Sequence, residues 1–268
     1  FYRKEGTGIF VQYYAFIWEH SANSGFFKGV AFPDPVKLSD LFGYENERAE
    51  ILENTLQFLK GYPANNVLLY GNRGTGKSST VKALANEYHS HGLRIIEVPK
   101  AYLGDFPEII RELRGRMQKF IIFVDDLTFE DSTENYTALK AVLEGGLERR
   151  PPNVLIYATS NRRHLIKERF SDRFDPLGDS SDEIHKNDGV QEKLSLADRF
   201  GITVIFAAPD QERFLEIVNS IAEQRSIGMA SKDLDRMALR WAARHNGFSP
   251  RTARQFIDWL EGHLALVK

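Results

Sequence analysis

Short apolar runs alternate with amphipathic segments through the middle of the chain. The runs are almost continuous in Val, Ile, Leu, Phe and Tyr, and we predict strands over 67–70, 94–98, 120–124, 154–158 and 202–206. Strands without polar alternation are expected where helices cover both faces of a parallel sheet. The intervening segments have apolar residues at helical spacing, which predicts helices over 45–61, 78–91, 107–117 and 136–144. This alternation predicts an α/β fold with a parallel sheet.

The pattern changes after Pro209, where amphipathic helices follow one another with no strand signal between them. We predict these helices over 211–225, 232–245 and 250–266. The polar segment 174–192, which holds an acidic run, is predicted to be a loop or an insertion. The chain is therefore divided into an N-terminal segment 1–37, an α/β domain 38–208 and a helical domain 209–268.

The N-terminal segment begins with Phe1 rather than Met, and we expect it to be the remnant of a truncated upstream region. Its aromatic side chains are expected to make core contacts.

Composition excludes several classes of site. The chain has no cysteine, so disulfides, thiolate zinc sites and cysteine nucleophiles are ruled out, and a cytoplasmic location is expected. No apolar run approaches the roughly 20 residues of a membrane helix.

The formal net charge of -2 gives no overall electrostatic signature of a nucleic-acid-binding protein. A basic stripe at helical spacing is interpreted as a solvated helix face. It consists of Arg236, Arg240 and Arg244.

The most informative motif follows the first predicted strand. The octapeptide 71–78, GNRGTGKS, fits the phosphate-loop pattern G-x-x-x-x-G-K-[ST] between a strand and a helix. Glycines let backbone N–H groups curl round an anion, and the helix N-terminus adds partial positive charge. Lys77 is expected to reach the β and γ phosphates, and Ser78 to ligate Mg²⁺. The motif therefore predicts a nucleoside triphosphate site. Its predicted binding residues are Gly71, Asn72, Arg73, Gly74, Thr75, Gly76, Lys77, Ser78 and Ser79.

Two carboxylates end the third predicted strand. Because ligands of parallel sheets bind at the carboxyl ends of the strands, Asp125 and Asp126 are expected beside the phosphate loop. Asp125 is suited to hold Mg²⁺ opposite Ser78. Asp126 is suited to polarise the water that attacks the γ phosphate.

Several longer strings make the chain resemble an AAA+ ATPase, and more narrowly the bacterial family called domain of unknown function 815. They are 63–71 (PANNVLLYG), 158–165 (ATSNRRHL), 192–201 (EKLSLADRFG) and 249–256 (SPRTARQF). The resemblance implies a three-layer sandwich with a five-stranded parallel sheet in the order 5-1-4-3-2 and a C-terminal helical lid. It also implies ATP and Mg²⁺ as cofactors.

The resemblance further implies roles for individual residues. The segment 41–44 (LFGY) resembles one that packs near adenine, with Gly43 and Tyr44 as its predicted binding residues. Asn161 resembles the sensor 1 position, with Thr159 and Ser160 as alternatives. Arg199 resembles an arginine finger acting on a neighbouring subunit; Arg173, in a similar string, is its alternative and is predicted to form an ion pair. Arg251 resembles the sensor 2 arginine, with Arg254 as the alternative. The predicted catalytic set is Lys77, Asp126, Asn161, Arg199 and Arg251.

These roles imply an oligomeric ATPase that remodels a protein or nucleic-acid partner, with no membrane partner expected. A slow, nucleotide-gated binding module or loader is the alternative. A small-molecule kinase is disfavoured because its residue set would not explain Arg199, Arg251 and the helical lid together.

Overall fold

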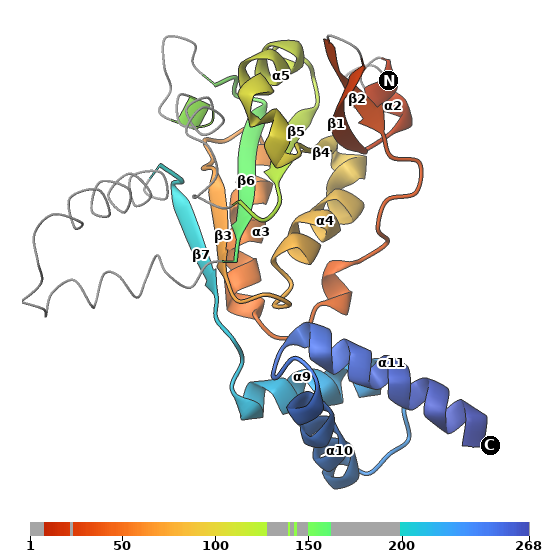
Figure 1. Ribbon diagram of the computed structural model, residues 1–268. Helices are drawn as coiled ribbons and strands as arrows, with labels where there is room; N and C mark the ends of the chain where they lie inside the picture. The colour runs from red at the N-terminus through yellow and green to blue at the C-terminus, as the bar shows by residue number, and fades with distance from the viewer. Residues whose placement is uncertain are drawn as a thin grey trace, which may run out of the picture.

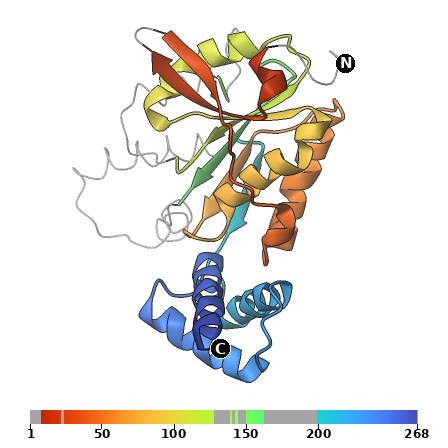
Figure 2. The ribbon, with the colours of Figure 1, turned by 90° about the vertical axis from the view of Figure 1, so that its right-hand side faces the viewer.

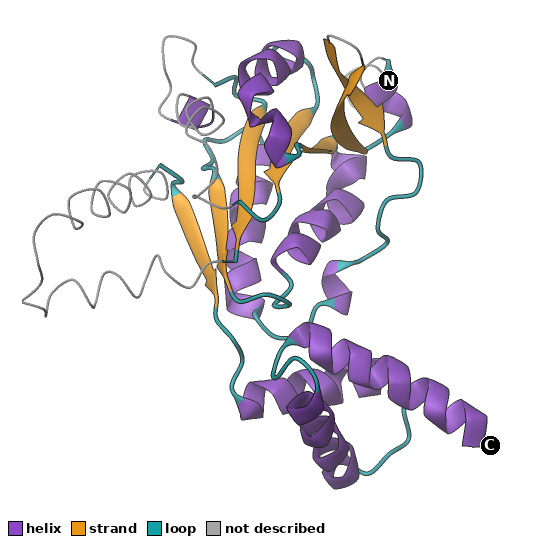
Figure 3. Cartoon of the chain, viewed as in Figure 1, coloured by secondary structure: helices purple, strands orange, loops and turns teal. Residues whose placement is uncertain are grey.

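The computed structural model describes residues 8–21, 24–127, 139, 142–143, 150–161 and 199–267. Within them, the strands form one sheet in the order β2-β1-β4-β5-β6-β3-β7 (Figure 1). All neighbouring strands pair in parallel except β1 and β2, which form an antiparallel hairpin (Figure 3). The strands are β1 Ala15–Ser21, β2 Ser24–Gly29, β3 Val67–Gly71, β4 Leu93–Glu97, β5 Lys119–Val124, β6 Val154–Ser160 and β7 Ile202–Phe206.

Each predicted strand is present, with ends displaced by at most two residues. Along the sheet these strands run β7-β3-β6-β5-β4, which is the order 5-1-4-3-2 in the numbering of the prediction. The predicted number of strands was wrong, because the described sheet has seven strands rather than five. The two additional strands come from the N-terminal segment, where β1 pairs in parallel with β4.

Helices cover both faces of the sheet. Up to residue 127 they are α2 Ile9–Gln12, η1 Leu38–Asp40, α3 Glu45–Leu59, α4 Lys77–Tyr88, η2 His89–His91, η3 Lys100–Asp105 and α5 Phe106–Leu113 in the described part of the chain. The predicted helix 136–144 lies largely outside the described residues, as do the polar segment 174–192, Arg173 and the string after Asn161.

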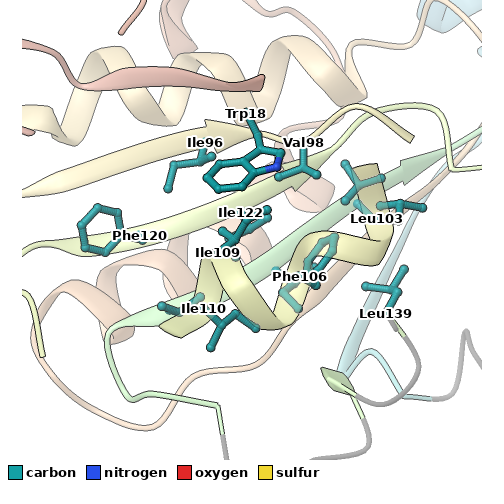
Figure 4. Packing of buried hydrophobic residues seen from close by; sticks show 14 of the residues in the cluster. Trp18, Ile96, Val98, Leu103, Phe106, Ile109, Ile110, Phe120, Ile122 and Leu139 are labelled. Carbon is teal, nitrogen blue, oxygen red and sulfur yellow. The ribbon is translucent and has the colours of Figure 1, made fainter. Parts of the chain in front are cut away.

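Side chains of the sheet alternate between two apolar layers, as the pleat of a strand requires. On one face, Phe120 and Ile122 of β5 pack with α5, α2 and the hairpin, and Trp18 lies among them (Figure 4). On the other face, Ile121 and Phe123 pack with α3 and α4. The expected core contacts of the N-terminal aromatics are confirmed for Phe16, Trp18 and Phe27, which are buried in the first layer. The expectation was wrong for Phe26, which is exposed because it lies on the outer face of the edge strand β2.

The C-terminal helices form a third apolar cluster of their own, built around Phe214, Phe256 and Leu260. They are α9 Gln211–Gln224, α10 Ser231–Arg244 and α11 Pro250–Val267. In both views they gather beyond the end of β7, next to the edge of the sheet where the parallel strands end (Figures 1 and 2). No helix in the described part of the chain is long and apolar enough to cross a membrane.

Candidate nucleotide site

The phosphate loop joins β3 to α4 in a conformation that requires glycine. Gly71, Gly74 and Gly76 have φ values of 137°, 77° and 94°, a region that side chains with a Cβ rarely adopt. A Cβ on Gly71 would lie 2.1 Å from the carbonyl oxygen of Phe206, because β3 and β7 run side by side to their ends. The turn therefore delivers the chain directly into the N-terminus of α4, where backbone N–H groups can receive an anion.

Lys77 is buried at the start of α4, with 5% of its surface exposed. Its ammonium donates hydrogen bonds to the backbone oxygens of Gly71, at 3.0 Å, and Asn72, at 2.7 Å. These bonds hold the Lys77 side chain against the phosphate loop. To contact a phosphate, the ammonium would exchange carbonyl oxygens for phosphate oxygens.

Burial lowers the pKa of Lys77 from its ordinary value of 10.5 to about 8, against the opposing effect of Asp125 and Asp126 and with the help of Arg251 and Arg73. Phosphate binding needs the ammonium form, so a bound triphosphate must raise this pKa again. We therefore expect affinity for a triphosphate to fall as pH rises above about 8, by up to roughly tenfold per pH unit. Titration calorimetry across this range, in buffers of different ionisation enthalpy, should show proton uptake on binding. The variant Lys77→Arg should show neither effect, and a wild-type affinity that stays constant across this range would contradict the prediction.

Asp125 is held from two sides at the end of β5. Ser78 Oγ and Thr159 Oγ1 each donate to Asp125 Oδ1, both at 2.6 Å. Thr159 Oγ1 also accepts the backbone N–H of Asp126 at 2.8 Å. The β6 threonine therefore orients the end of β5. Ser78 and Asp125 present hard oxygen ligands at one point of the loop, as Mg²⁺ prefers, since this ion keeps several waters and takes few protein ligands.

Asp126 has a left-handed backbone, with φ 54°. One carboxylate oxygen accepts a hydrogen bond from Asn161 Nδ2 at 2.5 Å, and the other lies 3.5 Å from Lys100 Nζ in η3. Asn161, the first residue after β6, is thus the member of its predicted group whose side chain bonds the Asp126 carboxylate. Thr159 instead bonds the Asp125 carboxylate and the Asp126 backbone, and Ser160 is buried with a hydroxyl that has no partner among the described residues.

A cleft of about 580 Å³ lies between the phosphate loop and the helical lid. Much of the predicted set meets there, and the lid contributes Arg251 and Arg254. The Arg251 backbone N–H donates to Gly74 O at 3.1 Å, and Arg254 Nη2 donates to Asp40 O at 2.7 Å. The predicted residues that line it are Arg73, Gly74, Thr75, Gly76, Lys77, Ser78, Ser79, Asp125, Asp126, Asn161 and Arg251.

Other predicted binding residues do not line this cleft. The backbone oxygens of Gly71 and Asn72 accept Lys77 Nζ, and the Asn72 side chain accepts the N–H of Ala208. Tyr44 is fully buried behind the wall: its ring stacks on Phe206 and its hydroxyl donates to Ala207 O. Gly43 also lies off the cleft. The other two residues of the predicted adenine segment, Leu41 and Phe42, do line the cleft.

Arg199 lies apart from its own cleft. It precedes β7, whose first residue Ile202 pairs with Val67 at the beginning of β3, whereas the phosphate loop follows the end of β3. The two ends of a strand of this length are roughly 13 Å apart. Arg199 is thus at the opposite edge of the sheet from the phosphate loop.

Two basic residues of the site were not predicted from the sequence. Lys100 contacts Asp126, and Arg48 lines the cleft. Lys100 falls in a connection without a motif, and its contact with Asp126 depends on the packing of η3. Arg48 follows Glu45 at helical spacing, a pattern that normally marks an exposed surface pair.

Four features together define a nucleotide-binding protein of the AAA+ class. They are the parallel sheet, the glycine-rich loop entering α4, the paired acids at the end of β5 and the adjoining helical lid. The chain belongs to the family described as "Protein of unknown function (DUF815)", whose model matches residues 11–264.

Curated relatives match shorter stretches. The chain is 35% identical over 103 residues to the 26S proteasome regulatory subunit 4 homologue of Dictyostelium discoideum, covering 33% of this chain and 24% of the relative. It is 39% identical over 70 residues to the proteasome-activating nucleotidase of Methanoregula boonei, covering 24% of this chain and 16% of that protein. The match therefore spans a quarter or less of these relatives.

Among solved structures, the fold is similar to that of the Thermotoga maritima RuvB Holliday junction branch migration motor. The TM-score is 0.57 at 18% sequence identity, covering 87% of this chain and 66% of RuvB. At this identity the likeness describes the fold alone.

Proposed function

We propose that this chain binds ATP with Mg²⁺ in the cleft between sheet and lid and hydrolyses the β–γ bond. The observation that carries the proposal is the arrangement around Asp125: its carboxylate accepts the Ser78 hydroxyl at 2.6 Å, at the start of the helix that also holds Lys77. A triphosphate cradled by the loop would place its terminal phosphates between the ammonium and the cation held by Ser78 and Asp125.

Asp126 and Asn161 are proposed to position the attacking water. Both line the cleft, and they follow the ends of adjacent strands, Asp126 two residues after β5 and Asn161 one residue after β6. In the arrangement described, Asn161 and Lys100 hold the Asp126 carboxylate, which keeps lone pairs to accept a proton from water. Arg251 is proposed to carry nucleotide contacts to the lid, since its backbone already bonds the phosphate loop.

The proposed output is remodelling of a macromolecular partner by an oligomer. The fold likeness to a branch migration motor and the sequence likeness to a proteasome-activating nucleotidase support this class of activity. The alternative is a nucleotide-gated binding module with slow turnover. The acid Asp126 favours this alternative, since it is one methylene shorter than the glutamate expected at that position from the family resemblance.

The substitution Asp126→Asn tests the proposal and separates the alternatives. We expect the variant to retain ATP binding and to lose turnover by about 10²- to 10⁴-fold, because the general base is removed while the phosphate loop is unchanged. Binding is measured by calorimetry and turnover by phosphate release. Asp105→Asn is the control, an acid that bonds Trp18 instead of lining the cleft.

Undiminished phosphate release by Asp126→Asn would remove Asp126 from the mechanism. Absence of Mg²⁺-dependent ATP hydrolysis in the unchanged protein would refute hydrolysis altogether. Partners retained by the variant in an ATP-dependent manner, and released by the wild type, would identify the macromolecule on which the protein acts.

A further inference from the structure

Arg48 is a buried charge at the edge of the cleft. It lies in the first turn of α3, lines the cleft and has 7% of its surface exposed. Taking a guanidinium out of water is unfavourable unless its donors are satisfied, and burial lowers the pKa of Arg48 accordingly. A charge is seldom kept in such a place without a partner for it.

The partners within the protein account for only part of this guanidinium. Its Nη2 donates to Leu41 O at 2.7 Å and to Glu45 Oε1 at 3.1 Å. An arginine head has five N–H donors, and neither Nε nor Nη1 donates a hydrogen bond to any residue that the structure describes. Glu45 is 70% exposed, so this ion pair contributes little. Because Arg48 lines the cleft, its remaining N–H donors can meet a ligand bound there.

The part of the cleft beside Arg48 suits a flat apolar ring. Leu41 and Phe42 form one wall, and Ile217 and Ile221 of α9 contribute from the lid. A nucleotide whose phosphates occupy the loop would extend its base between these side chains, as apolar pockets with a few polar groups commonly hold ligands.

The neighbouring Asp40 already has partners, since its Oδ1 accepts Gln224 Nε2 at 3.3 Å and its carbonyl accepts Arg254 Nη2. Arg254 also lines the cleft, but it is exposed to solvent, whereas Arg48 is buried. Arg48 is therefore the group best placed to meet a polar edge of the base.

We propose that Arg48 selects the nucleobase, donating from Nε or Nη1 to an acceptor atom on the edge of a purine. The proposal rests on the nucleotide function proposed above. A guanidinium can only donate, so it is satisfied by a ring nitrogen or a carbonyl oxygen and is not satisfied by an exocyclic amino group. Base identity would then contribute to affinity separately from the phosphates.

A thermodynamic cycle between Arg48 and the base tests this. Calorimetry with Mg²⁺ compares ATP, 1-deaza-, 3-deaza- and 7-deaza-ATP and inorganic tripolyphosphate on the wild type, Arg48→Met and Arg48→Lys. We expect one deaza analogue to bind the wild type roughly 10- to 100-fold more weakly than ATP, the range of a charge-assisted hydrogen bond. Arg48→Met should lose the same factor for ATP and lose nothing further with that analogue. Its affinity for tripolyphosphate should not change.

A purely structural role for Arg48, through Leu41, would weaken ATP and every analogue by the same factor. Fully additive losses would therefore overturn the proposal. If the methionine variant unfolds, Arg48→Lys, which keeps a charge able to reach Leu41 O, replaces it in the thermodynamic cycle.

Arg213→Met is the matched control, since this arginine packs on the buried Tyr44 ring and does not line the cleft. It should leave the discrimination among analogues intact. If the wild type binds neither ATP nor tripolyphosphate, the proposed function fails and this proposal with it, whereas ATP binding with additive losses overturns Arg48 alone.

Discussion

Replacing Lys77 with methionine is expected to reduce ATP turnover by at least about 10²- to 10³-fold, the effect of removing one preorganised donor from a site of developing charge. Methionine is also unbranched, is one atom shorter and has no charge. The buried ammonium bonds two loop carbonyls from the first residue of α4. Phosphate release under saturating ATP and affinity for ATP are the measurements.

Lys82 provides the control for this variant. It lies on the same helix, has 42% of its side chain exposed and lies 3.9 Å from Asp34 instead of facing the phosphate loop. Lys82→Met should therefore turn over ATP like the wild type. Equal loss in the two variants would point to a general effect on α4, and normal turnover in Lys77→Met would exclude the proposed phosphate contact.

The sheet could be predicted from sequence because its central strands are unusually uniform. Residues of β5 and β6 are almost all buried, so runs of apolar residues mark both their positions and their parallel pairing. The hairpin β1–β2 was missed because its pairing with β4 joins residues about 80 positions apart, such as Phe16 and Ile96. Pairing at that distance depends on tertiary contacts that local patterns do not record.

The candidate site was predictable where backbone geometry imposes residue types. The loop glycines are one example, because positive φ angles favour glycine. The acids at the end of β5 are another, because ligands of parallel sheets bind at the carboxyl ends of the strands. The residues of the predicted adenine segment that line the cleft were harder to predict. Tyr44 takes a left-handed conformation at φ 62° as α3 begins, and this turns its ring into the core rather than the cleft. Only the three-dimensional path of 41–44 decides which of these residues face a nucleotide.

The lid and the phosphate loop are joined through backbone contacts that sequence alone does not reveal. Arg251 N–H bonds Gly74 O on one side, and Arg254 bonds the η1 segment on the other. A ligand that displaces either contact changes the position of the lid relative to the sheet. Nucleotide binding is therefore expected to be coupled to lid movement, as in enzymes whose sites close over their substrates.

Substitution of Arg199 by alanine is expected to lower turnover by about 10³- to 10⁵-fold, the range for an arginine that stabilises a transferring phosphoryl group. ATP binding should remain close to that of the wild type, because Arg199 does not line the cleft of its own chain. Arg199→Lys should stay impaired, since an ammonium lacks the planar fork of a guanidinium. Turnover equal to the wild type in Arg199→Ala would refute the role.

A mixing experiment separates action on a neighbouring subunit from action within one chain. Asp126→Asn keeps Arg199 but cannot activate water, and Arg199→Ala keeps an intact cleft. In a random equal mixture, about one interface in four of a cyclic assembly joins an intact cleft to an intact arginine, so part of the activity should return. Because β3 and β7 place Arg199 at the sheet edge away from its own phosphate loop, recovery is the result the geometry favours. A mixture as inactive as its components, in protein shown to assemble by light scattering, would mean that Arg199 does not act across subunits.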